Sequence, residues 1–140
     1  MAWTMSNPSK QKGTAAETKV VRYLQEHGID AERRALSGSS DKGDILVRYP
    51  AGGGRIIEVK TGQQTANPSR TQIEEWLDQT RKEMMNAGLY AADLVLVRYR
   101  RSIEDADVYT INAVTNRRLH SWLDEYVEHL KRIVELQEEE

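Results

Sequence analysis

The chain has 140 residues, of which 39% are hydrophobic and 30% charged, a balance that favours one folded domain over residues 1–140 with a substantial core. This composition argues against intrinsic disorder, and the short apolar runs predict neither a membrane-spanning segment nor a secretory signal. The absence of cysteine excludes disulfides, zinc-thiolate sites and a cysteine nucleophile. It suits the reducing cytoplasm, where we expect the protein to act.

Charge is distributed unevenly along the sequence although the net charge is only −2. Residues 1–102 carry 16 Lys and Arg against 12 Asp and Glu, whereas residues 103–140 carry 4 against 10. A mildly basic body of this kind is able to face phosphates, but it is also what an ordinary solvated surface looks like. Charge alone therefore leaves both interpretations open.

The N-terminal third predicts a polar, disordered lead-in, a helix and a weak strand. The lead-in covers residues 1–9, and the helix runs from about Lys10 or Thr14 to His27, where Gly28 ends it. A short strand is expected near residues 29–34. The following stretch, residues 36–43, is rich in Ser and Gly and is expected to be a flexible loop.

The middle of the chain predicts a β-hairpin, a helix and two further strands. Residues 44–49 and 55–60 are rich in β-branched side chains and flank the turn-forming residues 50–54. Capping-box patterns at Ser69 and Thr71 open a helix that ends near Ala87. Apolar residues 93–99 predict a central strand, and residues 108–111 predict a short one.

The last predicted element is a helix within about residues 116–136, followed by an acidic tail, so that residues 116–140 form a C-terminal helix and tail. Its apolar stripe contains Trp122, Leu123, Tyr126, Val127, Leu130, Ile133 and Val134. The stripe either completes the core or forms a dimer face anchored by Trp122 and Tyr126. The order α-β-β-β-α-β-β-α implies an α/β fold with a central mixed sheet flanked by helices.

The candidate chemistry lies on the hairpin. Because strand side chains alternate, Glu58 and Lys60 share one face, and the turn places Asp44 across from Glu58 to Lys60. Two carboxylates at such a short distance from each other repel unless a cation lies between them. Oxygen ligands without Cys or His select Mg²⁺ or Mn²⁺, to which the backbone carbonyl of Val59 adds a neutral ligand.

Such an arrangement is suited to hydrolysis of a phosphodiester. A bound divalent ion lowers the pKa of its water and polarises a phosphoryl oxygen. Lys60 would orient the attacking water or stabilise charge in the transition state. The alternative is structural, with an exposed Glu58–Lys60 pair on an edge strand and Asp44 at the start of its partner.

The residues Asp44 and Glu58-Val59-Lys60 resemble the signature of the PD-(D/E)xK nucleases, with Gly43 where that superfamily often has proline. The upstream order looks like the archaeal Holliday junction resolvase branch and its phage relatives, over about residues 10–62. The matching segments are Lys12-Gly13 with Glu17, Glu26-His27-Gly28, Arg34-Ala35-Leu36-Ser37-Gly38-Ser39 and Gly43-Asp44-Ile45.

The resemblance implies a restriction-endonuclease-like fold and a metal-dependent DNA endonuclease acting on branched DNA, most specifically a four-way junction. It implies that Asp44 and Glu58 bind metal, and that Glu17 binds it directly, through water or as part of a second site. It also implies a loop serine needed for cleavage, either Ser37 or Ser39. Thr14-x-x-Glu17 also fits a capping box, in which case Glu17 only closes a helix start.

Basic residues near the proposed site, namely Arg33, Arg34, Lys42 and Arg70, are candidates to bind DNA phosphates. A homodimer is expected, because a four-way junction is approximately two-fold symmetric and each chain has one site. The implied setting is a prokaryotic or phage-infected cell. The alternatives are an exonuclease, repair or restriction-type nuclease of the same superfamily, and a DNA-binding protein of this fold that does not cleave.

Overall fold

The computed structural model describes residues 8–35, 43–112 and 118–138, with side chains described for residues 15–34, 45–112 and 120–138. These residues form a mixed sheet with helices on both faces, which confirms the predicted α/β class. The elements in chain order are α1 (Pro8–Glu26), β1 (Asp30–Ala35), β2 (Gly43–Arg48), β3 (Gly54–Lys60), η1 (Gln63–Thr65), α2 (Arg70–Asn86), β4 (Ala91–Leu96), η2 (Ile103–Asp105), β5 (Asp107–Asn112), β6 (Arg118–Trp122) and α3 (Leu123–Glu138).

The six strands of the sheet lie in the order of the sequence, from β1 to β6. Only β3 and β4 run parallel, and every other neighbouring pair is antiparallel. A parallel pair needs a crossover connection, and α2 provides it by packing across β3, β4 and β5. The strand predicted at residues 93–99 is β4, and it is central as expected.

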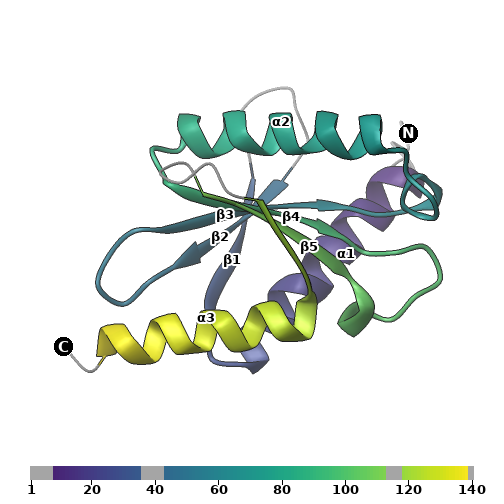
Figure 1. Cartoon of the computed structure of the whole chain (residues 1–140). Coiled ribbons are helices and arrows are strands. Elements are labelled where there is room, and N and C mark those ends of the chain that lie inside the picture. Colours follow the sequence, from purple (N-terminus) through teal and green to yellow (C-terminus); the bar gives the residue numbers. More distant parts are fainter. Residues whose placement is uncertain (1–7, 36–42, 113–117, 139–140) are drawn as a thin grey trace, which may run out of the picture.

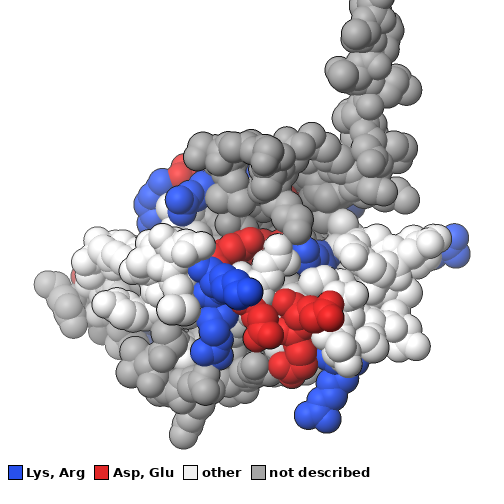
Figure 2. Space-filling view, turned by 90° about the horizontal axis from the view of Figure 1, so that it is seen from above, with Lys and Arg blue, Asp and Glu red and all other residues white. Residues whose placement is uncertain are grey.

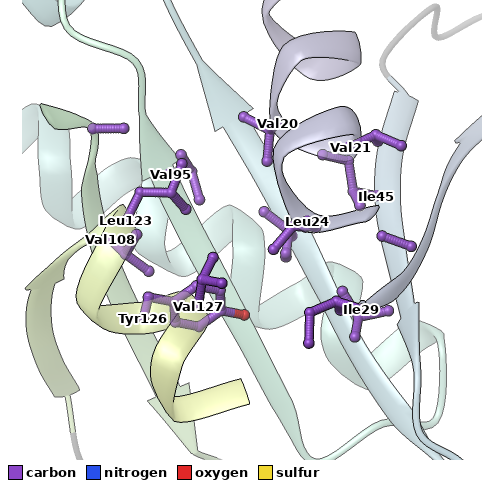
Figure 3. Packing of buried hydrophobic residues seen from close by; sticks show 14 of the residues in the cluster. Val20, Val21, Leu24, Ile29, Ile45, Val95, Val108, Leu123, Tyr126 and Val127 are labelled. Carbon is purple, nitrogen blue, oxygen red and sulfur yellow. The ribbon is translucent and has the colours of Figure 1, made fainter. Parts of the chain in front are cut away.

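The sheet separates two apolar clusters. On one face, α1 and α3 pack against the strands, while α2 covers the opposite face (Figure 1). The larger cluster joins Val20 and Leu24 of α1 to Val95 and Val108 of the sheet, with Tyr126 of α3 beside them (Figure 3). The smaller cluster lies under α2 and consists of Ile56, Trp76, Leu77, Met84, Ala92, Leu94, Leu96 and Ile111.

The hairpin of β2 and β3 has the predicted topology, and its register places Ile45 opposite Ile57. The turn closes through hydrogen bonds between Tyr49 and residues 52 and 53. Gly54 is required where the strand begins, because a Cβ there would lie 2.0 Å from the carbonyl oxygen of Val47. The register therefore brings the chain positions of Asp44 and Glu58 to the same end of the hairpin.

The predicted helix boundaries hold for α2 and shift for α1. Ser69 caps α2, because its Oγ accepts a hydrogen bond of 3.1 Å from the backbone amide of Gln72. Helix α1 begins at Pro8, before both predicted starts, since proline is well suited to a first helical turn. Residues 1–7 of the predicted lead-in lie outside the described residues.

The C-terminal region differs from its prediction. Residues 118–122 form a sixth strand, β6, which pairs with β5 through contacts such as Asp107 opposite Trp122. Trp122 therefore ends a strand and is 49% exposed, rather than belonging to the helical stripe. The remaining stripe residues, Leu123, Tyr126, Val127 and Leu130, are buried, with Ile133 and Val134 packed against them, so this face of α3 completes the core.

Within the described residues, no helix combines the length and apolar character needed to cross a membrane.

Candidate active site

Strand β3 places Glu58 and Lys60 side by side in a largely apolar setting. Glu58 is only 3% exposed, and the Lys60 side chain is 12% exposed. The Lys60 Nζ lies 3.4 Å from Glu58 Oε1, as expected for side chains two residues apart on one strand. This burial excludes the alternative of a solvated pair on an exposed edge strand.

One oxygen of the Glu58 carboxylate is left without a protein partner. Glu58 Oε2 is buried and has no hydrogen-bond partner among the described residues. A buried carboxylate oxygen left unsatisfied is costly, and such atoms in folded proteins commonly mark an ion or water site. The oxygen-only chemistry around Glu58 therefore fits a hard divalent cation.

Helix α1 brings Glu17 to the same region. Glu17 is 8% exposed, and its Oε2 accepts a hydrogen bond of 2.5 Å from the Nε of Arg33 on β1. Burial raises the pKa of the Glu17 carboxyl above its ordinary value. The hydrogen bond and charge of Arg33 lower that pKa, and the negative charge of nearby Glu58 raises it further. Two carboxylates thus converge from α1 and β3.

The position of Glu17 in α1 excludes its role as an N-terminal capping residue. The helix begins at Pro8, so Glu17 lies well inside it, past the first turn where a capping-box carboxylate would act. Its carboxylate is turned to Arg33 on a strand rather than to the helix start. The capping alternative raised by Thr14-x-x-Glu17 is therefore wrong.

Several predicted site residues fall outside the described side chains. The Asp44 backbone belongs to β2 and pairs with Arg34 of β1, but its side chain is not among those described. Ser37, Ser39 and Lys42 lie outside the described residues altogether. Among the described residues, to which the Asp44 side chain does not belong, no group of three or more His, Cys, Asp or Glu side chains could hold a metal ion.

The basic candidates occupy different settings. Arg33 is ion-paired with Glu17, and its side chain is 38% exposed. Arg34 is exposed on β1, and Arg70 is exposed at the first residue of α2. The surface seen from the α2 side mixes acidic and basic side chains rather than presenting a uniform basic patch (Figure 2). The structure therefore brings Arg33 to Glu17, while Arg34 and Arg70 are exposed on separate elements.

Sequence reasoning missed two sets of buried polar contacts. Arg55, 4% exposed, donates from Nε and Nη2 to the two carboxylate oxygens of fully buried Asp93, which also accepts from Thr110 and Tyr126. Thr65 is also fully buried and joins the segment after β3 to the end of β4. Arg55 and Asp93 are charged residues within the otherwise apolar strands β3 and β4, and this pattern could have indicated their pairing. No local pattern distinguished Thr65.

The geometry on β3 and α1 can be compared with known proteins. The family model of the archaeal Holliday junction resolvase (Hjc) matches residues 8–125. The chain belongs to this family. Membership identifies it as a Holliday junction resolvase, an endonuclease of branched DNA within the PD-(D/E)xK superfamily. The six-stranded sheet and its helices fit the restriction-endonuclease-like fold of Hjc proteins.

The Hjc match extends well beyond the segment in which the motifs were recognised. It begins with α1 and continues through β6 into the first turn of α3. Searches among curated proteins and among solved structures found no match. The family is metal-dependent, which agrees with the buried Glu58 oxygen that has no partner in the part of the chain that the structure describes. The family assignment decides against the general nuclease and the non-cleaving DNA-binding protein as alternatives.

Proposed function

We propose that this resolvase cleaves four-way junctions with Mg²⁺, or Mn²⁺ in its place, held by Asp44 and Glu58. The Val59 carbonyl adds a neutral ligand, and Glu17 contributes directly, through a water, or to a second ion. Support comes from the register that sets Asp44 and Glu58 at one end of the hairpin, and from the closeness of Glu17 to Glu58. Oxygen ligands of this kind select small hard cations.

The observation that carries this proposal is the buried Glu58 carboxylate, with one oxygen near Lys60 and the other unpartnered among the described residues. A structural carboxylate in an apolar setting would have both oxygens satisfied. An oxygen reserved for a ligand is what a metal site requires. Glu17 adds negative charge nearby, which a divalent cation would neutralise.

The reaction is hydrolysis of a phosphodiester. When bound, the divalent ion lowers the pKa of a water and stabilises negative charge on the phosphoryl oxygens. Lys60 holds the attacking water by donating from its ammonium, and it stabilises the charge of the transition state. The water oxygen forms a bond to phosphorus, one P–O ester bond breaks, and the products are a phosphate monoester and a hydroxyl.

The remaining predicted residues serve substrate binding. We assign Arg33, Arg34, Lys42 and Arg70 to phosphate contacts, and either Ser37 or Ser39, in the sequence between β1 and β2, to a role in cleavage. Arg33 is suited both to hold Glu17 in the proposed metal site and to contact a phosphate, because it is paired with Glu17 while part of its side chain remains exposed. Phosphate contacts position the DNA without reading its sequence, which fits a substrate recognised by shape.

The active form is proposed to be a homodimer, in which each chain supplies one nuclease domain over residues 1–140. Two symmetric sites would cut opposing strands of a junction that is itself approximately two-fold symmetric. The apolar face of α3 is occupied by the core, so it does not supply the dimer face. The dimer contact must then involve another surface.

Cleavage of a labelled four-way junction tests the proposal most directly, with Mg²⁺ and with EDTA, beside linear duplex and flap substrates of equal length. We expect paired nicks in the junction with Mg²⁺, none with EDTA, and weak cleavage of the linear duplex. Binding should weaken steeply with salt, because phosphate contacts release counterions. Cleavage that persists in EDTA would remove the metal assignment, and equal affinity for duplex and junction would remove recognition by shape.

A further inference from the structure

The segment that follows Lys60 is tied to the end of β4 by one buried side chain. Thr65 is the last residue of η1 and is fully buried. Its hydroxyl lies 2.7 Å from the carbonyl oxygen of Gly62 and 3.1 Å from that of Val97, and it accepts a hydrogen bond of 3.1 Å from the amide of Tyr99. A hydroxyl has one proton and two lone pairs, so it can donate to either carbonyl while accepting from the amide.

Backbone contacts complete the attachment. The carbonyl oxygen of Lys60 accepts a hydrogen bond of 2.9 Å from the amide of Val97, just beyond the last ladder pair, Lys60 with Leu96. The carbonyl oxygen of Thr65 accepts one of 3.0 Å from Arg98 Nη1. Thr65 therefore continues the attachment between β3 and β4 past the point where the regular ladder ends.

This attachment bears on the proposed site because Lys60 is the last residue of β3. Its backbone is held on one side by the strand and on the other by a segment that turns at Gly62, whose φ of 87° is in the left-handed region. Without the Thr65 hydroxyl, the amide of Tyr99 would lose its partner, and the segment would be held to β4 only by the contacts of the Lys60 and Thr65 carbonyl oxygens. Small displacements of a catalytic group cost large factors in rate.

We propose that Thr65 is a positioning residue that fixes the end of β3 and thereby the ammonium of Lys60 beside Glu58. The inference rests on the role proposed for Lys60. A purely structural role for Thr65 would alter the free energy of unfolding and leave the cleavage rate of the folded protein unchanged. A positioning role would lower the rate of the chemical step while junction affinity stays the same.

Two substitutions separate the hydroxyl from the volume of the side chain. Thr65→Val keeps the shape and removes the hydrogen bonds, and Thr65→Ser keeps the hydroxyl and removes a methyl group. Thr80→Val is the matched control, because Thr80 is equally buried but its hydroxyl bonds to the carbonyl of Trp76 within α2. Each variant is assayed for single-turnover cleavage of a four-way junction with saturating enzyme, junction affinity in EDTA, and thermal unfolding.

For Thr65→Val, we expect the single-turnover rate to fall at least tenfold at a temperature where the variant is folded, with affinity within twofold of the wild type. Thr65→Ser should keep the rate within about threefold, and Thr80→Val should cleave at the wild-type rate whatever its melting temperature. A Thr65→Val rate within twofold of wild type would overturn the inference. So would a loss in Thr65→Ser as large as that in Thr65→Val, since packing rather than the hydroxyl would then be responsible.

Lys60→Ala, assayed in parallel, separates this inference from the proposed function. If Lys60→Ala cleaves at the wild-type rate, the role proposed for Lys60 fails, and the positioning inference fails with it. If Lys60→Ala is inactive while Thr65→Val is fully active, only the positioning inference fails. Loss of rate in both variants, with Thr65→Ser active, is the result that supports it.

Discussion

The Nε of Arg33 on β1 donates a hydrogen bond of 2.5 Å to Glu17 Oε2 on α1, and this contact holds the helix carboxylate beside the sheet. Glu17 is nearly buried, whereas the Arg33 side chain is partly exposed. The pair thus connects the interior, where Glu58 lies, to the solvent-exposed side of β1, which we propose contacts DNA. Because burial outweighs the attraction of Arg33, the pKa of Glu17 is raised rather than lowered.

That raised pKa predicts how the stability of the metal-free protein depends on pH. The folded state favours the protonated carboxyl of Glu17, so its stabilising contribution is fully present below about pH 4.5 and is lost as pH rises through the raised pKa. The free energy of unfolding of the wild type, relative to Glu17→Gln, should therefore decrease over that window. Urea unfolding between pH 4 and pH 8 measures it, with exposed Glu26→Gln as the control on the same helix.

A bound divalent metal ion should lower the pKa of Glu17, whereas burial raises it. A cation near the carboxylate favours its charged form, so Mg²⁺ should raise the melting temperature of the wild type more at neutral than at acidic pH. Glu17→Gln should show a smaller metal-induced shift and should lose cleavage. Equal metal shifts in both proteins, with cleavage retained in Glu17→Gln, would exclude Glu17 from the metal site.

Asp44→Asn and Glu58→Gln preserve side-chain shape and remove ligand charge. Each should slow single-turnover cleavage by about 100-fold or more, which corresponds to about 2.7 kcal/mol or more in the barrier. Junction affinity should stay unchanged or become tighter, because a negative charge facing the phosphates is removed. Glu75→Gln on the exposed side of α2 is the control and should cleave normally. A Glu58→Gln variant with substantial activity would show that the metal assignment is wrong.

The proposed homodimer predicts the outcome of mixing wild-type and Glu58→Gln chains. A heterodimer has one working site, so it should nick one strand of a junction and stop, whereas the wild type gives paired, symmetry-related nicks. Supercoiled plasmids carrying a cruciform report the difference, because one nick relaxes the circle and two opposed nicks linearise it. Sedimentation of the complex with junction DNA provides the independent check, and a monomer at micromolar concentration would contradict the proposal.

The buried contacts of Asp93 predict a large effect on stability that is separate from catalysis. Asp93→Asn leaves the guanidinium of Arg55 buried without its counter-charge, which should cost about 3–5 kcal/mol of unfolding free energy. Tyr126→Phe removes only the hydroxyl that bonds to Asp93 and should cost about 1 kcal/mol. Urea unfolding measures both, with exposed Asp78→Asn as the control. Similar losses in the two variants would contradict an ion pair as the main contribution.

Local patterns in the sequence were enough to predict the hairpin and the shared face of Glu58 and Lys60. The β-branched residues around the turn predicted the pairing of β2 with β3, because strand alternation and a short turn act over neighbouring residues. The same held for the start of α2, where the Ser69 hydroxyl caps the helix. Strand alternation also predicted that Glu58 and Lys60 share one face, but only the structure showed that the pair is buried.

Only the tertiary structure decided which distant residues meet. The contact of Glu17 with Arg33, and its closeness to Glu58, depend on how α1 packs across the strands, and no local pattern encodes that arrangement. Strand β6 was missed, and Trp122 was assigned to the wrong element, because so short a strand is stabilised by its pairing with β5 rather than by its own propensities. The sequence by itself determined the elements whose contacts are local, and long-range packing decided the rest.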